Sequence, residues 1–470
     1  MVENNGSALC LEQLKKELEY IYDVQYRELL CRSVRVTLVY VQSMCDSRQI
    51  SEFIIRPLYN KLNRLHSLRT IAGSIIQAGM VVETRDLDTA ISSVLSGQVL
   101  VVFHNHEAIL TCDMKKYERR SVEIPQTETV IKGPREGFSE DININISEIR
   151  RRIKSPLLKM ERYSLGEQSK TEAVLVYIKG TTPDKLIAYA REKINLIRED
   201  YVFYPTRLEN ALKCKTTSFD TIGYTEKPDV ASSKLVEGRI LILLDGNPFV
   251  ITAPNFFIEA FQTTDDYTLN PVMANMGRLF RWISFFMALF VPGLYLALVT
   301  YHFKLVPNIF LYRLALFRAG VPVPTVIELL YMVLFFQIIR EAGVRLPQPI
   351  GPTLSIVGAL ILGDAAVTSG LASQITVVVV AITSIASYLI PVMHGSIFLW
   401  SLCIVLFSSM LGLPGFYMGG VLFISHLAGL TSCGYPYLYP FGTEKTFKYQ
   451  DIFIKGTKGK QAGPPLKEDR

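Results

Sequence analysis

Charged residues are distributed unevenly along this 470-residue chain, and their distribution divides it into two halves. Residues 1–270 carry a charge in nearly every block of ten, as a water-soluble protein does. Residues 282–301 (WISFFMALFVPGLYLALVTY) and 375–393 (ITVVVVAITSIASYLIPVM) carry none, and no Asp, Glu, Lys or Arg occurs from Ala365 to Thr443. Each of the two runs is long enough to cross a hydrocarbon layer of about 30 Å as a helix. The pattern predicts a soluble front half followed by an integral membrane back half.

The back half, residues 278–430, is expected to be a multi-helix membrane domain. Its first span follows Arg278 and Arg281, with Trp282 at the interface. Residues 304–324 contain three prolines and are expected to be interfacial. The run at 325–339 carries Glu328 and Gln337 and is only fifteen residues long, so it is predicted to be an interfacial or re-entrant helix. Further apolar elements are expected at 353–371, at 373–393, and as two short runs within 396–430.

The number of membrane spans stays open between four and six. A basic stretch between Lys445 and Arg470 follows the last apolar run, so residues 431–470 are expected to form a basic cytoplasmic tail. The N-terminus has no signal-peptide pattern, so the soluble half is expected in the cytoplasm as well. Both ends on one side require an even number of spans. Lys304, Arg313 and Arg318 would then lie on the opposite side, against the usual charge bias.

The front half contains a repeated pattern. VTLVYVQSMCDSRQISEFI (36–54) resembles AVLVYIKGTTPDKLIAYA (173–190), and VLSGQVLVVFHNHEAILT (94–111) resembles LVEGRILILLDGNPFVIT (235–252). The two offsets, 137 and 141 residues, are nearly equal. The DGN turn between apolar strands in the second copy indicates a hairpin. We therefore expect an α+β soluble region made of two related α/β subdomains, at 30–140 and 141–265, after a helical segment at 1–29.

Composition and charge narrow the class of protein. Nearly half of the residues are hydrophobic (49%), and the mean hydropathy is +0.25, in keeping with a membrane protein. The net charge of +6 is modest, and no nucleic-acid partner is expected. The seven cysteines show no CxxC pair, which fits reduced thiols in a cytosol-like compartment.

The sequence contains none of the common catalytic or metal-binding motifs that would indicate an enzyme. GxxxxGK[ST], HExxH and GxSxG motifs do not occur in the sequence. His104 and His106 lie where the second copy has its DGN turn, so a solvated turn is favoured over a metal site. We expect no enzyme, no metal and no cofactor.

Charges are concentrated between the two copies, in residues 127–156. The stretch holds acidic residues and a run of three arginines at its end. It is either a surface connector with a basic helix face or a contact surface between subunits. The candidates for subunit contact are Arg135, Glu136, Arg150, Arg151 and Arg152.

Polar residues inside the apolar half are the candidates for function. Asp364 stands in IVGALILGDAAVTSG, and a membrane carboxylate usually faces water or protein. Thr376, Thr383 and Ser387 are seven and four residues apart and share one helical face, so they are pore candidates with Asp364. The alternatives are that Asp364 is hydrated at the membrane edge, and that the hydroxyls pack against a neighbouring helix. Glu328 and Gln337 are further membrane polar candidates.

The order of these parts resembles one family closely: the A subunit of GerA-type nutrient germinant receptors of endospore-forming bacteria. The resemblance covers residues 30–450 and is carried by blocks at 127–156, 234–267, 340–370 (REAGVRLPQPIGPTLSIVGALILGDAAVTSG) and 426–440. It implies a protein of the spore inner membrane whose soluble part faces the spore core. It also implies a transporter-like B subunit that binds nutrient, a C-subunit lipoprotein, and self-association into a homo-pentameric ring forming a nutrient-gated cation channel. A close paralogue encoded with the dipicolinate channel operon shares this architecture.

Two other functions remain open at the sequence level. The chain could be a non-conducting membrane scaffold for its partner subunits, with Asp364 and the hydroxyl stripe serving packing. It could also be a secondary transporter, a class that usually shows inverted repeats among its spans. The repeat found here lies in the soluble half only, which disfavours the transporter.

Overall fold

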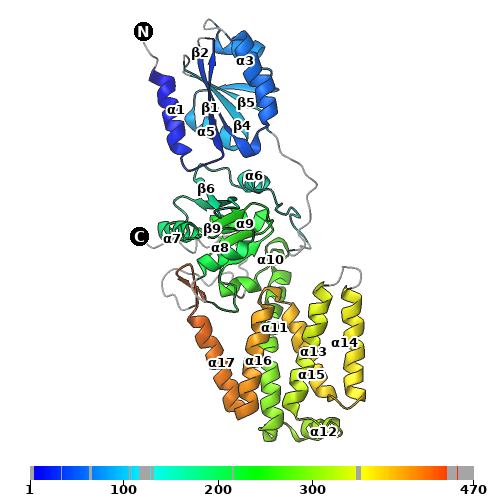
Figure 1. Ribbon diagram of the computed structural model, residues 1–470. Coiled ribbons are helices and arrows are strands. Elements are labelled where there is room, and N and C mark those ends of the chain that lie inside the picture. The colour runs from blue at the N-terminus through cyan, green and yellow to red at the C-terminus, as the bar shows by residue number, and fades with distance from the viewer. Residues whose placement is uncertain are drawn as a thin grey trace. The chain divides into compact units, whose positions relative to one another are not determined.

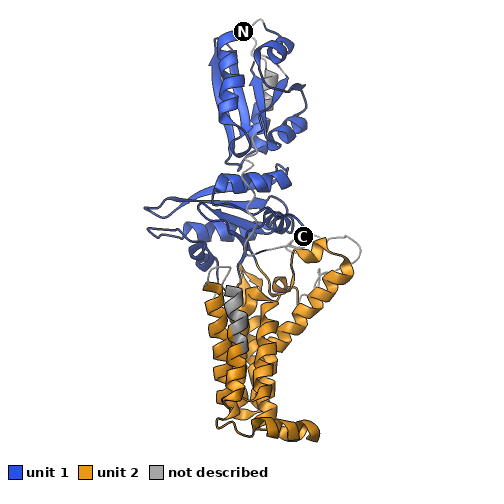
Figure 2. Ribbon diagram, turned by 90° about the vertical axis from the view of Figure 1, so that its right-hand side faces the viewer, with its two compact units in different colours: residues 1–214, 222–254, 461–470 blue, residues 215–221, 255–460 orange. Residues whose placement is uncertain are grey.

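The computed structural model describes residues 5–32, 34–62, 66–104, 106, 108–115, 128, 132–213, 216–345, 351–441 and 453. These residues form two compact units (Figures 1 and 2). Unit 1 comprises residues 1–214, 222–254 and 461–470, and unit 2 comprises 215–221 and 255–460. The basic tail predicted from Lys445 to Arg470 lies outside the described residues, apart from position 453.

The first half of unit 1 is a five-stranded antiparallel sheet in the order β1-β2-β4-β5-β3. Helices pack on both of its faces, α1 and α5 on one and the segment from α2 to η3 on the other. Its elements are α1 (Asn5–Glu17), β1 (Val24–Cys31), β2 (Val34–Val41), η1 (Gln42–Met44), α2 (Ser47–Gln49), η2 (Ile50–Ile55), α3 (Arg56–Lys61), α4 (Leu68–Thr70), η3 (Ile71–Ile75), β3 (Val81–Thr84), α5 (Leu87–Leu95), β4 (Gln98–Phe103) and β5 (Ile109–Asp113).

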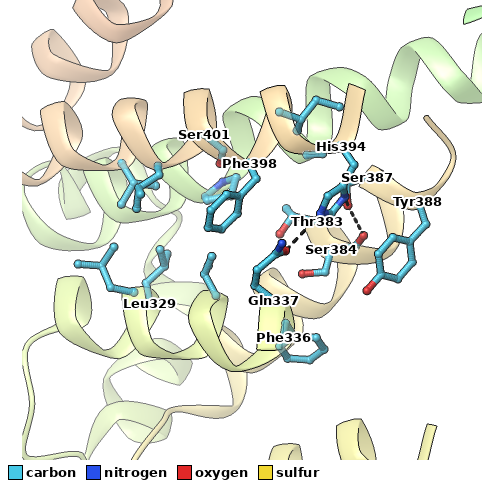
Figure 3. A pocket seen from close by; sticks show the side chains of 17 residues that line it. Leu329, Phe336, Gln337, Thr383, Ser384, Ser387, Tyr388, His394, Phe398 and Ser401 are labelled. Carbon is cyan, nitrogen blue, oxygen red and sulfur yellow. Dashed lines mark hydrogen bonds between the residues drawn. The ribbon is translucent and has the colours of Figure 1, made fainter. Parts of the chain in front are cut away.

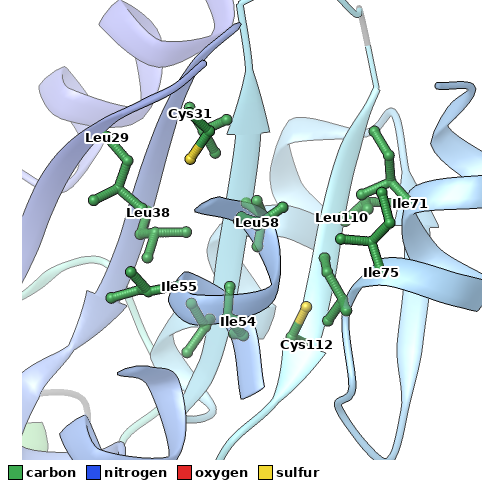
Figure 4. Packing of buried hydrophobic residues seen from close by; sticks show 14 of the residues in the cluster. Leu29, Cys31, Leu38, Ile54, Ile55, Leu58, Ile71, Ile75, Leu110 and Cys112 are labelled. Carbon is green, nitrogen blue, oxygen red and sulfur yellow. The ribbon is translucent and has the colours of Figure 1, made fainter. Parts of the chain in front are cut away.

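Buried aliphatic side chains fix these helices to the sheet. Figure 4 shows Ile54, Ile55 and Leu58 of the helical segment facing Leu38 and Leu110 of the strands. The strands alternate their side chains between the two faces, so β2 presents Val39 and Val41 to α1 and α5 on the opposite side. Both faces of the central strands are therefore apolar, which is why β2 (VRVTLVYV) and β4 (QVLVVF) are rich in hydrophobic residues. The edge strand β1 (VQYRELLC) is more polar.

The second half of unit 1 repeats this plan with the strand order β6-β7-β9-β10-β8. Its elements are α6 (Ile142–Arg152), β6 (Leu158–Leu165), β7 (Thr171–Ile178), α7 (Asp184–Asn195), α8 (Pro205–Leu212), β8 (Gly223–Thr225), α9 (Pro228–Val236), β9 (Ile240–Leu244) and β10 (Val250–Ala253). Helices α6 and α9 cover one face of the sheet. On the other face, Arg191 of α7 contacts Tyr177 of β7.

Strand register supports the repeat seen in the sequence. Val36 pairs with Phe103 and Val39 with Leu100 in the first sheet. The positions 137 and 141 residues further on pair in the same way, Ala173 with Leu244 and Val176 with Leu241. Gly97 and Gly238, matched in the sequence, both have positive φ (+83° and +89°) where a helix turns into a strand. The predicted boundary at residue 30 falls inside β1, and α1 packs on the first sheet, so the repeat begins with α1 rather than at 30.

A buried ion pair joins the two halves of unit 1. Arg150 of α6 donates from Nε to Asp23 Oδ2 over 2.9 Å, and Ser43 Oγ donates to the same oxygen over 2.8 Å. Both charged side chains are almost fully buried. Backbone bonds lie beside the pair, including Met160 N to Tyr20 O at 2.9 Å. The segment between α1 and β1 therefore docks against the second half.

The described residues of unit 2 form a bundle of helices and one short hairpin. Its elements are η4 (Phe257–Phe261), α10 (Asp265–Thr268), α11 (Pro271–Thr300), η5 (Phe303–Leu305), α12 (Asn308–Arg318), α13 (Thr325–Arg345), α14 (Gly351–Thr368), α15 (Gln374–Tyr388), η6 (Pro391–Met393), α16 (His394–Leu411), α17 (Leu413–Ala428), β11 (Thr431–Ser432) and β12 (Tyr435–Pro436). Among the described residues, the helix Pro271–Thr300 and the stretch Pro391–Leu411 are long and apolar enough to cross a membrane.

Arg278 and Arg281 do not act as free interfacial anchors. Both donate to the buried carboxylate of Asp266, from Arg278 Nε at 3.3 Å and from Arg281 Nη2 at 2.6 Å. Trp282 stacks on Phe261 with ring centroids 3.7 Å apart. These contacts fix the start of α11 to the preceding segment of the same unit.

Two predicted membrane elements differ in the structure. The stretch expected to be a short interfacial or re-entrant helix at 325–339 is α13, a helix of 21 residues and so about 31 Å long. The apolar run ended in the sequence at Arg340 and Glu341, but the helix continues through both to Arg345. Glu328 and Gln337, which lie within the run, are bonded inside the bundle. The span expected at 375–393 ends at Tyr388, and a new helix begins at His394, because Pro391 cannot continue the helix.

Glycines allow α11, α16 and α17 to approach closely. A Cβ added to Gly293 of α11 would lie 2.7 Å from Ile404 Cγ2, and one added to Gly419 would lie 3.1 Å from Ile404 Cα. At Gly415, an added Cβ would lie 2.0 Å from the carbonyl oxygen of Phe407. Gly415 and Gly419 form a small-xxx-small pattern of the kind that brings membrane helices together. Here the pattern packs α17 on α16 within one chain.

We expect Gly415→Ala to destabilise the bundle by about 1–3 kcal/mol, because the added methyl meets backbone that cannot rotate away. The matched control is Gly395→Ala in α16, where an added Cβ meets no atom within 4 Å. Thermal unfolding of the full-length protein in detergent measures both. Equal melting temperatures for Gly415→Ala and Gly395→Ala would contradict the close contact of Gly415 with the Phe407 backbone.

We expect Asp23→Ala to cost about 3–5 kcal/mol, because it leaves the Arg150 charge buried without its partner. Glu136→Gln, which breaks a half-exposed pair with Arg152, should cost no more than about 1 kcal/mol. Hydrogen exchange of the α6 amides in the full-length protein reports the difference. The double variant Asp23→Leu, Arg150→Met should recover most of the loss, and wild-type exchange in Asp23→Ala would refute the role of the pair.

Candidate functional site

Polar side chains meet inside unit 2 among four apolar helices. They come from α11, α13, α15 and α16 and form two groups within the bundle. One group surrounds Glu328 in the first turn of α13, and the other surrounds His394 in the first turn of α16. Buried polar groups need hydrogen-bond partners, and each of the two groups draws its partners from more than one helix.

Glu328 is fully buried and binds the start of α15. Its Oε1 accepts two hydrogen bonds of 2.6 Å, one from the backbone N–H of Ser373 and one from the Ser373 hydroxyl. Ser373 is the N-cap of α15, and its Oγ accepts from Thr376 N at 3.3 Å. The N-terminus of a helix carries partial positive charge, so it favours a carboxylate at this position. Glu328 thereby extends the cap of α15 across to α13.

The group around Glu328 reaches a third helix through hydroxyls. Ser373 Oγ lies 3.0 Å from Thr376 Oγ1, which lies 2.9 Å from the Tyr295 hydroxyl of α11. The second carboxylate oxygen, Oε2, is shielded from water and has no hydrogen-bond partner among the described residues. One carboxylate thus connects α13, α15 and α11 and keeps one oxygen available as an acceptor.

The second group is a chain of three side chains from three helices. His394 Nδ1 lies 2.9 Å from Ser387 Oγ of α15, and His394 Nε2 lies 3.2 Å from Gln337 Oε1 of α13 (Figure 3). The three residues line a cavity of about 60 Å³ with Thr383, Ser384 and Ser401 among its other polar residues. A cavity of this size and polarity has room for a few water molecules.

The hydroxyl stripe predicted on α15 lies inside the chain. Thr376 and Ser387 belong to the two groups above. Thr383 Oγ1 donates back to Val379 O at 2.9 Å and lines the cavity. All three side chains are buried. This placement favours the packing alternative for the stripe over the pore-lining prediction.

Asp364 occupies a different environment. It lies on α14, which packs against α13 (Figure 1). The Asp364 side chain is exposed in the single chain. Its backbone oxygen accepts from Thr368 Oγ1 at 2.8 Å, one turn before the helix ends. The carboxylate is therefore available to water, to lipid or to another protein.

The five subunit-contact candidates separate into three environments. Arg150 is buried in its pair with Asp23, so it cannot contact a neighbouring copy, and the prediction for this residue is corrected. Glu136 pairs with Arg152 at 2.5 Å and lies 3.9 Å from Arg151, so these opposite charges meet within one chain. Arg135 is exposed, and Arg151 keeps 44% of its side chain exposed.

Several residues of the two groups were missed by the sequence reading. Ser373 could have been found, since a Ser before an apolar helical run is an N-cap signal. His394 and Tyr295 give no comparable signal: the Gln337 partner of His394 lies 57 residues away in the chain, and the Thr376 partner of Tyr295 lies 81 residues away.

Two thiols of the soluble half, those of Cys45 and Cys112, are buried. Burial raises the pKa of the Cys45 and Cys112 thiols to about 12, which keeps both protonated and unreactive. His104 Nε2 lies 3.0 Å from Thr37 Oγ1 in a turn after β4. Within the described residues, no three His, Cys, Asp or Glu side chains form a group that could hold a metal ion.

The chain matches the family model described as Bacillus/Clostridium GerA spore germination protein over residues 12–464. It belongs to the GerA family. Spore germination protein KA of Bacillus subtilis is 35% identical over 95% of this chain and 83% of the relative. GerLA of Bacillus cereus is 32% identical, covering 95% and 92% of the two chains. The B. subtilis membrane protein YfkQ is 34% identical, covering 95% and 88%.

Among solved structures, one similar chain is the N-terminal domain of the A subunit of the Bacillus megaterium spore germinant receptor GerK3. It is 26% identical, with a TM-score of 0.40, and the match covers 53% of this chain and 94% of that one. The names of these relatives describe germination and membrane proteins, and none of them describes an enzyme.

We expect Glu328→Ala to destabilise the bundle of this GerA family member by about 3 kcal/mol, because Ser373 N and Oγ lose a charged acceptor. Glu328→Gln keeps an acceptor oxygen and should cost less. The matched control is Glu341→Gln on the same helix, where the side chain is 54% exposed. Thermal unfolding in detergent measures all three variants. A Glu328→Ala protein with the same melting temperature as Glu341→Gln would contradict the capping role.

Proposed function

We propose that the chain is the A subunit of a nutrient germinant receptor and that it assembles into a ring, a homo-pentamer in the family it resembles, whose membrane helices form a nutrient-gated cation channel. The ring lies in the spore inner membrane, with the two repeated subdomains on the cytoplasmic, core side. Family membership and the two helices long enough to cross a membrane support this proposal. Symmetric assembly is the usual way to build a ring from one chain.

The exposed carboxylate of Asp364 carries the proposal. Residues around it on α14 are apolar, and Ile361 is 59% exposed in the single chain. A carboxylate facing hydrocarbon costs about 2.5–3.5 kcal/mol or more at the membrane centre. Assembly that turns this side of α14 toward a shared aqueous path removes the cost. A ring of such carboxylates favours cations over anions.

Nutrient recognition is assigned to a partner. The cavity beside His394 measures about 60 Å³, whereas small-molecule pockets usually measure about 300–1,000 Å³. The family implies a transporter-like B subunit that binds the nutrient and a C-subunit lipoprotein. Exposed Arg135 and Arg151 are the remaining candidates for contacts between copies or with these partners.

A non-conducting scaffold is the second candidate function. The observation that favours it is the internal bonding of Thr376, Thr383 and Ser387, which serves packing and leaves Asp364 as the one pore candidate of the four that is exposed. In a scaffold, Asp364 would be hydrated at the membrane edge, one turn before α14 ends.

We expect spores that carry Asp364→Asn to release potassium about fivefold more slowly after nutrient addition, since loss of a charge about 4 Å from a cation in water removes about 1 kcal/mol of attraction. Potassium in the medium is followed with an ion-selective electrode. Spores are matched for the amount of the protein by immunoblotting.

The control for this experiment is Glu341→Gln, which removes an exposed carboxylate near the C-terminal end of α13. This variant should leave potassium release unchanged. Wild-type kinetics and unchanged ion preference in Asp364→Asn would remove Asp364 from the ion path. That result would favour the scaffold.

A further inference from the structure

The connection between α11 and α13 is exposed and mostly apolar. We call residues 301–324 the α12 segment. None of the residues of α12 is buried in the chain. Apolar and aromatic side chains are exposed over its whole circumference: Ile309 (77%), Tyr312 (68%), Phe310 (66%), Leu316 (55%) and Phe317 (41%). An exposed apolar set of this size marks a contact with lipid or with another protein.

The charged side chains of the α12 segment are all basic. Lys304, Arg313 and Arg318 are the charged residues of the segment, and no Asp or Glu occurs in the sequence from Tyr267 to Ile327. Lys304 and Arg313 are exposed and form no ion pair with a residue that the structure describes. Glu328, the next acid, is bonded to Ser373. The segment therefore presents uncompensated positive charge.

The position of α12 limits what can cover it. It lies crosswise at the end of α11, and both views show it across the end of the bundle (Figures 1 and 2). Pro307 precedes it, and Pro322 and Pro324 follow it, so the helix cannot continue into either neighbouring helix. Because α11 is a membrane-crossing candidate that ends at Thr300, the segment that follows it reaches the membrane surface.

We propose that the α12 segment is a binding surface for anionic phospholipids. Its apolar side chains enter the upper acyl region, and Lys304 and Arg313 extend to headgroup phosphates. Long basic side chains place an apolar stem in lipid and a charged end at the interface. The distribution of charge favours lipid over protein: the only polar side chains of α12 besides its arginines are Asn308 and Tyr312, which gives a partner protein few directional contacts. The proposal rests on the proposed membrane location and is independent of ion conduction.

Hydrogen exchange of the full-length protein in lipid nanodiscs tests this surface. Discs contain phosphatidylcholine with or without phosphatidylglycerol, and exchange is followed at residues 308–318. Near a charged surface each Lys or Arg contributes about 1 kcal/mol, which is about fivefold in an equilibrium constant. We therefore expect phosphatidylglycerol to slow exchange of α12 in the wild type, and Lys304→Gln with Arg313→Gln to remove that slowing. Arg345→Gln, at an exposed site on α13, is the matched control and should behave as wild type.

Three results would overturn the proposal. Equal exchange of α12 in the two kinds of disc would show that it does not select anionic lipid. Slowing that occurs only when partner subunits are co-purified would make the surface a protein contact. Rapid exchange of α11 in both discs would show that the chain is not inserted, which would also refute the proposed membrane location. Slow hydrogen exchange of α11, together with α12 exchange that is the same in both kinds of disc, would refute the lipid site and leave the membrane location intact.

Discussion

Glu328 shows the constraint on which the helical unit depends. A polar group inside an apolar bundle must find its partner within the protein, because neither lipid nor buried hydrocarbon supplies one. Glu328 meets the constraint at the first turn of α15, where two donors and the helix terminus face its carboxylate. His394 meets it between Ser387 and Gln337. The polar residues thereby determine which helices are neighbours, while apolar contacts alone would permit many arrangements.

Close backbone approach completes the same bundle. Ile404 of α16 lies against Gly293 of α11 on one side and Gly419 of α17 on the other. Dispersion contacts of this kind are the main attraction between helices when no water is displaced. Asp364 is the exception to both rules, since it is charged, exposed and outside the packed interior. The proposed ring accounts for this exception by placing the exposed Asp364 carboxylate beside water.

Unit 1 contains two similar sheets that must be held together. Each sheet buries both faces under its own helices, so little apolar surface remains to hold the halves together. The contact between them includes the buried pair of Asp23 and Arg150, and beside it Tyr22 packs against the apolar cluster of the second half. Such a pair adds little net stability compared with apolar residues, but breaking it is costly, so it fixes one arrangement. Within the arginine run 150–152, Arg150 is buried in this pair, whereas Arg151 and Arg152 lie beside Glu136.

Three features could be predicted from the sequence: the division into a charged half and an apolar half, the repeat within the charged half, and the helix at 353–371 that holds Asp364. These features depend on residues close together in the chain, whose hydropathy and turn signals add up locally. Three other features required the three-dimensional structure: that 325–339 belongs to the longer helix Thr325–Arg345, that the α15 hydroxyls face inward, and that Arg150 is buried. Each of those outcomes depends on a partner far away: Glu328 meets Ser373 45 residues later, and Arg150 meets Asp23 127 residues earlier. A local pattern carries no information on such a partner, because the free energy of a buried charge is set by what the fold places beside it.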